Sequence, residues 1–123
     1  MASRPTVVWT EIPVTDLDAA VTFYNTVFGW DLKIDSSGPN PMAMFGDGSP
    51  AAHGHLYPGR PAAAGTGNTI HLAVPDALSA ALDRCKQAGG KVVSPPIEIP
   101  AGRFVYAEDP DGNSIGLFEA PSA

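Results

Sequence analysis

The chain has 123 residues, of which 44% are hydrophobic, and its formal net charge at neutral pH is −6. This length and apolar content support one compact folding unit with its own core. The 7 Lys and Arg residues form no run, so nucleic acid is a poor partner, because its phosphates repel an acidic surface.

The same composition argues against a membrane protein. No apolar stretch approaches the roughly 20 residues of a membrane-spanning helix, and residues 1–5 lack the basic start and hydrophobic stretch of a signal peptide. The single cysteine, Cys85, cannot form an internal disulfide, and its apolar helical position favours a small core residue over a nucleophile. We therefore expect a cytoplasmic protein with no membrane partner.

The first half of the chain predicts a strand, a helix and further strands. Residues 6–14 are rich in β-branched and aromatic side chains, which favours a strand with Trp9 and Glu11 on one face. Asp16 is a candidate helix N-cap, and apolar residues recur at helical spacing until Gly29, which favours the left-handed end of a helix. Further strands are predicted at 30–34, 42–45 and 53–57.

The second half repeats this order of elements. Residues 68–74 predict an opening strand, and Asp76 is expected to cap a helix whose apolar face includes Cys85. Gly89 and Gly90 end that helix. Strands follow at 91–94, 102–107 and 114–119, the last two joined by a tight turn at 109–113.

A shift of 60 positions relates the two halves, since it places Asp76 on Asp16 (76 − 16 = 60) and His71 on Glu11. Corresponding residues of a duplicated unit should face each other across the pocket between the copies, which makes Glu11 and His71 the candidate site. The predicted organisation is a single domain, 1–123, of two modules, about 6–57 and 68–120, joined by a Pro-, Gly- and Ala-rich linker at 58–67.

Four separated motifs, in order along the chain, resemble the vicinal oxygen chelate superfamily. They are Pro13 to Leu17, Phe23-Tyr24 with Phe28-Gly29-Trp30, Ala88-Gly89-Gly90, and Glu108 to Asn113. That superfamily includes glyoxalase I, bleomycin-resistance proteins, fosfomycin-resistance enzymes and ring-cleaving dioxygenases. The resemblance covers nearly the whole chain. It implies an α+β fold of two tandem βαβββ modules that form an open, curled mixed β-barrel with the helices outside, commonly completed in a homodimer.

The resemblance also implies where a metal would bind, because many members hold one between the first and last strands of each module. The first-strand ligand positions fall on Trp9 and Thr69. The last-strand position falls on Gly116 in the second module and on Gly54 or Leu56 in the first. Indole, glycine and a lone hydroxyl are poor ligands for a divalent metal, so we expect the usual metal site to be lost and no cofactor to be bound.

Glu11 and His71 each lie two residues beyond a first-strand ligand position, so strand alternation keeps both on the pocket face. Three roles are open to this pair: a structural or ligand-orienting contact, an acid and base that move a proton, or ligands of a displaced divalent metal. His53 and His55 are expected to turn away from the pocket, because the same alternation turns Gly54 inward.

Glycine at positions where metal ligands would project, together with aromatic side chains, predicts room for an apolar or planar small molecule. The residues expected to contact that molecule are Trp9, Gly54, Thr69, Phe104, Tyr106, Gly116 and Phe118.

Two functions follow from such a pocket. A glyoxalase-like lyase or isomerase would use Glu11 and His71 as catalytic residues for proton transfer on a small carbonyl compound. A non-catalytic protein would instead sequester a cationic or aromatic metabolite or antibiotic, as the resemblance to metal-free bleomycin-resistance proteins implies.

Overall fold

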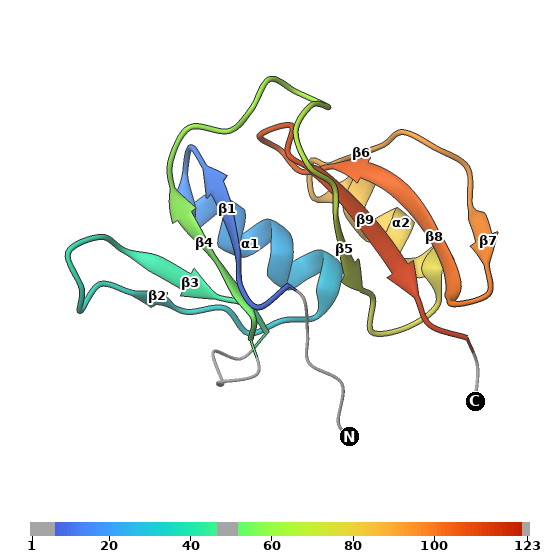
Figure 1. The fold of residues 1–123 in the computed structure, drawn as a ribbon, viewed down its shortest axis with the longest axis horizontal. Coiled ribbons are helices and arrows are strands. Elements are labelled where there is room, and N and C mark those ends of the chain that lie inside the picture. Colours follow the sequence, from blue (N-terminus) through green and yellow to red (C-terminus); the bar gives the residue numbers. More distant parts are fainter. Residues whose placement is uncertain (1–6, 47–51, 122–123) are drawn as a thin grey trace.

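The computed structural model describes residues 7–46 and 52–121, which form two similar groups of strands and helices (Figure 1). The first group comprises β1 (Thr10–Val14), α1 (Leu17–Phe28), β2 (Ile34–Asp35), β3 (Met42–Met44) and β4 (Gly54–Pro58). The second group comprises β5 (Ile70–Ala73), α2 (Leu78–Gln87), β6 (Lys91–Val92), β7 (Ile97–Ile99), β8 (Gly102–Glu108) and β9 (Ser114–Glu119).

Each group forms its own sheet. The first sheet has the strand order β1-β4-β3-β2, with β1 parallel to β4 and the other neighbours antiparallel. The second has the order β5-β9-β8-β6, with β5 parallel to β9 and with β7 also paired to β8. Neither sheet closes on itself, so the predicted α+β fold with an open, curled arrangement of strands is confirmed.

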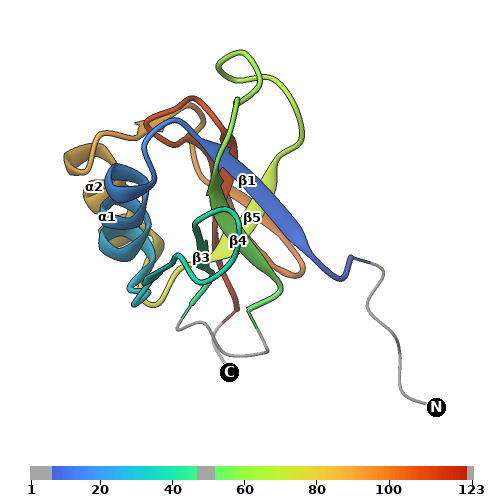
Figure 2. The same ribbon diagram turned by 90° about the vertical axis from the view of Figure 1, so that its left-hand side faces the viewer.

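Both helices lie on the same side of the two sheets and pack against each other (Figure 2). The core lies between helices and sheets, where each large apolar side chain that is buried contributes about 1.5–3 kcal/mol. Cys85 belongs to this core with an exposed fraction of 0%, and burial raises the pKa of its thiol to about 11. In the described residues, no helix is both long and apolar enough to cross a bilayer.

Helix α1 has the two ends that the sequence predicted. Asp16 Oδ1 accepts a hydrogen bond from the Ala19 amide at 3.1 Å, which satisfies one of the free donors of the first turn. Gly29 follows the last turn at a φ of 69°, and its amide donates to the carbonyl of Asn25. Only glycine adopts this left-handed conformation without strain, so the sequence determines this boundary locally.

The capping role predicted for Asp76 is wrong. Helix α2 begins after Ala77, which makes no side-chain capping bond. The Asp76 carboxylate instead binds the Arg84 guanidinium through two contacts, Nη1 to Oδ2 at 2.7 Å and Nη2 to Oδ1 at 2.9 Å. Arg84 also donates from Nη2 to the carbonyl of Val27 at 2.9 Å, at the C-terminal end of α1. Asp76 therefore orients an arginine that joins the two helices.

Several strands are shorter than predicted, most of all those expected at 30–34 and 91–94, and one strand was missed. The strand expected at 30–34 is reduced to β2, because Trp30 stacks on the rings of Tyr24, Phe28 and Phe45 instead of joining a sheet. The strand expected at 91–94 is reduced to β6, and β7 was not predicted. Strand β7 pairs only with β8, and prolines lie on both sides of it, which is typical of a sheet edge.

A buried polar network joins the two modules. Tyr24 donates from its hydroxyl to Asp109 Oδ2 at 2.8 Å. Asn113 Nδ2 donates to the same oxygen at 2.9 Å and to the Pro13 carbonyl at 2.8 Å. Burial raises the pKa of the Asp109 carboxyl, and its hydrogen bonds oppose that shift. The predicted turn at 109–113 is thereby fastened to both α1 and β1.

This network should contribute measurably to stability. The substitution Tyr24→Phe removes one hydrogen-bond donor from the Asp109 carboxylate, which is only 4% exposed. We expect the free energy of unfolding to fall by about 1–3 kcal/mol. Urea denaturation at neutral pH measures this free energy. The matched control is Tyr106→Phe at a position that is 38% exposed, where we expect a change within about 0.5 kcal/mol. Equal stability of Tyr24→Phe and the unchanged protein would contradict the assigned role.

Candidate functional site

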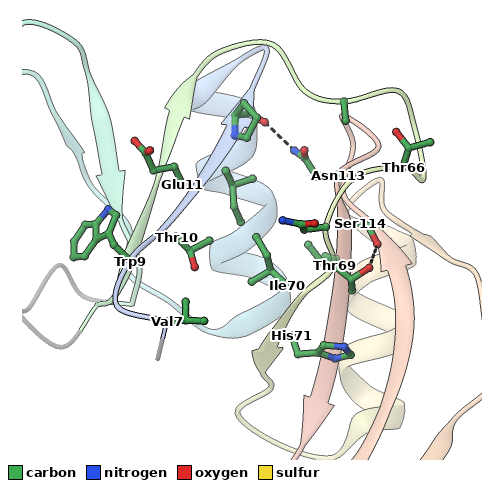
Figure 3. Close-up of a pocket in the computed structure, with 16 residues that line it drawn as sticks. Val7, Trp9, Thr10, Glu11, Thr66, Thr69, Ile70, His71, Asn113 and Ser114 are labelled. Carbon is green, nitrogen blue, oxygen red and sulfur yellow. Dashed lines mark hydrogen bonds between the residues drawn. The ribbon is translucent and has the colours of Figure 1, made fainter. Parts of the chain in front are cut away.

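A cleft of about 890 Å³ lies between the modules and is lined by residues of β1 and β5, the edge strands of the two sheets (Figure 3). This volume falls in the range of about 300–1,000 Å³ that is typical of small-molecule sites. The lining side chains that matter most for its chemistry are Trp9, Glu11, Thr66, Thr69, His71 and Asn113.

The linker between the modules forms part of the cleft wall. Ala62, Thr66 and Gly67 line the cleft. The linker is held to the second module because the Gly65 amide donates to the Gly112 carbonyl at 3.0 Å. The predicted linker is therefore packed against the turn at 109–113 and closes one end of the cleft.

The structure does not bring Glu11 and His71 together, although both line the cleft. Their side chains point away from each other, Glu11 toward β4 and His71 toward β9 (Figure 3). The Glu11 carboxylate instead lies beside His55, with 3.3 Å between Oε1 and Nε2. The contact that the internal repeat predicted is thus not formed within the described residues. Their catalytic roles stay predictions.

His55 has a role beside the site that the sequence did not predict. It was expected to turn away from the pocket. It lies on the same sheet face as Trp9 and Glu11 and contacts both, although it is not among the residues that line the cleft. The reason is the register of the parallel strands, in which Glu11 is opposite His55, so alternation places both side chains on one face. Only the pairing of strands far apart in sequence carries this information.

Gly54 was expected to face the pocket, and that expectation is wrong. A Cβ at Gly54 would meet the Phe45 ring and would lie 2.7 Å from the Thr10 carbonyl oxygen, so this residue packs on the opposite face of the sheet. The register also places His55, not Gly54 or Leu56, at the position equivalent to Gly116 in the second module.

Trp9, His55 and Glu11 form a chain of polar contacts on the first sheet. Trp9 Nε1 donates to His55 Nδ1 at 2.9 Å. Because an indole N–H can only donate, Nδ1 must accept through its lone pair. The imidazole is therefore neutral, and its proton is on Nε2, the nitrogen that faces Glu11. Both nitrogens of this histidine are engaged, whereas the Glu11 side chain remains 64% exposed.

His71 lies in an aromatic cluster on the second sheet. Its ring centroid is 4.8 Å from that of Phe104, 5.8 Å from that of Tyr106 and 6.1 Å from that of Phe118. The imidazole covers Gly116, where an added Cβ would overlap it. The space at Gly116 was expected to be open for a ligand. That expectation is wrong, because the His71 imidazole fills it.

Of the four positions that the superfamily uses for metal ligands, one holds a good metal donor in this chain, His55, and the set as a whole does not fit a metal. In the first module Trp9 is bound to His55. In the second module Thr69 Oγ1 shares a hydrogen bond with Ser114 Oγ at 2.5 Å, and Gly116 offers no ligand. The described residues hold no group of 3 or more His, Cys, Asp or Glu side chains arranged for a metal ion. These donors contact each other instead.

Residues 6–117 match the family model described as the Glyoxalase/Bleomycin resistance protein/Dioxygenase superfamily. The chain therefore belongs to that superfamily, as its motifs predicted. It is 32% identical over 117 residues to a protein named putative glyoxylase CFP32 from Mycobacterium tuberculosis, in a match that covers 91% of this chain and 44% of that relative. The chain thus spans less than half the length of this relative.

Two solved structures show how widely this fold is used. The antibiotic binding protein TnmS3 from Streptomyces sp. CB03234 is 26% identical, with a TM-score of 0.63 over 98% of this chain and 100% of that chain. The fosfomycin resistance protein FosX from Listeria monocytogenes has a TM-score of 0.67 at 18% identity, over 98% and 96% of the two chains. At that identity the likeness to FosX shows the fold alone.

The packing of His71 over Gly116 can be tested with a double-mutant cycle. We expect Gly116→Ala to destabilise the protein by about 1–3 kcal/mol, because the new methyl group displaces the imidazole. In a His71→Ala background the same change should cost much less, since the obstacle is gone. Gly38→Ala, where a Cβ meets nothing within 4 Å, is the control. Identical costs in both backgrounds, measured by urea denaturation, would contradict the contact.

Proposed function

We propose that this protein binds an aromatic or otherwise planar small molecule in the cleft between its modules, without a metal ion. The observation that carries the proposal is an aromatic side chain at one of the ligand positions. Trp9 occupies one such position and is 41% exposed at the cleft. An exposed indole offers a large stacking surface at a low cost in side-chain entropy.

The orientation of Trp9 supports the proposal further. Its indole is held by the hydrogen bond to His55, so little side-chain freedom remains to be lost when a ligand stacks on the ring. Preorganisation of this kind raises affinity because fewer rotamers must be fixed on binding. A relative that is named as antibiotic binding, TnmS3, supports a metabolite or antibiotic as the class of ligand.

A binding experiment tests this function. Thermal-shift screening of aromatic acids, aromatic amines and glycopeptide antibiotics should identify molecules that raise the melting temperature, because a ligand of the folded state stabilises it. For any ligand found, Trp9→Ala should weaken binding by about 2- to 10-fold, the size of one aromatic contact. Val93→Ala, at an exposed position outside the cleft lining, is the control. Unchanged affinity in Trp9→Ala would contradict the proposed site.

A second function, proton transfer on a small carbonyl compound, is favoured by two observations. Glu11 and His71 both line the cleft, and one relative is named a putative glyoxylase. The two groups would act separately, each from its own wall, because they do not contact each other. Such a lyase or isomerase needs a substrate that spans the space between β1 and β5.

Turnover measurements separate the two functions. If the protein is an enzyme, it should convert the hemithioacetal of methylglyoxal and a small thiol, and Glu11→Gln or His71→Ala should reduce kcat by at least about 100-fold. Full turnover in both variants would remove these residues from the mechanism. The homodimer implied by the resemblance also stays a prediction, which sedimentation velocity would check.

A further inference from the structure

The described residues that line the cleft carry one formal charge, which is negative. Among the described residues that line it, Glu11 is the single carboxylate, and neither Lys nor Arg is present. The other lining side chains are apolar, hydroxyl or amide groups, apart from the imidazole of His71. A ligand that enters this cleft therefore meets one negative charge.

That charge is not cancelled by its neighbour. In the described part of the chain, the only basic side chain beside the Glu11 carboxylate is that of His55, with 3.3 Å between Oε1 and Nε2. Trp9 donates to Nδ1 of that histidine, which keeps the imidazole neutral with its remaining proton on Nε2. A neutral imidazole in contact with one carboxylate oxygen restricts the side chain without removing its negative charge. The second oxygen stays available, because the Glu11 side chain is 64% exposed.

We propose that Glu11, positioned by the neutral imidazole of His55, binds the cationic group of an organic amine or ammonium ion whose aromatic or planar body occupies the cleft. This inference rests on the proposed binding function and adds the charge of the ligand to it. Trp9 contributes twice. Its N–H sets the tautomer of His55, and its partly exposed ring lines the cleft two residues before Glu11, where a ring face can attract a cation.

The neighbouring residues give His55 a positioning role. His55 is only 8% exposed, so it does not need to touch the ligand to influence binding. Without the imidazole 3.3 Å from its Oε1, the Glu11 side chain would have more rotamers open to it, and fixing it would cost more entropy when the ligand binds. Glutamine can reproduce this role, since its amide both accepts from Trp9 and donates to Glu11. Phenylalanine cannot.

Three probes of nearly equal size test the charge preference: 2-phenylethylamine as the cation, 2-phenylethanol as the neutral molecule and 3-phenylpropionate as the anion. Titrations followed by the NMR signals of the Trp9 indole N–H and the cleft amides give each affinity. We expect the amine to bind about 10-fold tighter than the alcohol, which corresponds to one charge-assisted hydrogen bond. The anion should bind most weakly.

Matched variants assign that preference to residues. In Glu11→Gln, which keeps the size and hydrogen-bonding capacity of the side chain, the amine should lose its advantage while the alcohol binds as before. His55→Phe should reduce the preference for the amine, and His55→Gln should restore it. The imidazole ¹⁵N shifts of the unchanged protein report the tautomer directly, so this part of the test holds even if a variant fails to fold.

The outcomes distinguish failure of the cation site from failure of the proposed binding function on which it rests. Equal affinity for amine and alcohol, or an amine preference that persists in Glu11→Gln, overturns the cation site and leaves the binding function standing. Nitrogen shifts that place the proton of His55 on Nδ1 overturn its positioning role. If none of the three probes moves a cleft signal up to its solubility limit, the proposed binding function fails together with this inference.

Discussion

The candidate site depends on the parallel pairing between the first and last strands of each module. In the first module this register sets Glu11 opposite His55, and in the second it sets His71 opposite Gly116. Because side chains alternate along a strand, a slip by one residue would send all four to the other face. The contacts of Trp9 with His55 and of His71 with its aromatic neighbours exist only in this register.

The register also brings together side chains at the positions where the superfamily holds metal ligands. Trp9 binds His55, Thr69 binds Ser114, and His71 covers Gly116. A buried polar atom without a partner costs about 1–3 kcal/mol, so these hydrogen bonds favour the observed arrangement. Each of these contacts lies within one module.

Contacts between the modules hold the two walls of the cleft relative to each other. Arg84 joins the two helices, and the Asp109 network joins the turn at 109–113 to β1 and α1. Asn113 belongs to this network and also lines the cleft. A buried polar network that is fully hydrogen-bonded favours one arrangement of its elements, because alternatives would leave buried groups unpaired. The spacing between β1 and β5 therefore follows from the joint between the modules.

Local signals along the chain determined the elements and the family. The Asp16 cap, the Gly29 end and the tandem strand–helix order could be predicted because each depends on neighbouring residues. Residue types alone indicated that Trp9, Thr69 and Gly116 are poor metal ligands, whereas the strand register placed His55 at the remaining ligand position. The tertiary structure alone decided which side chains meet, as for His55 with Glu11 and for Asp76 with Arg84. His55 and Glu11 lie on separate strands, and Asp76 lies at a helix end where it binds an arginine instead of capping the helix. The spacing of residues along the sequence does not determine which of these side chains meet.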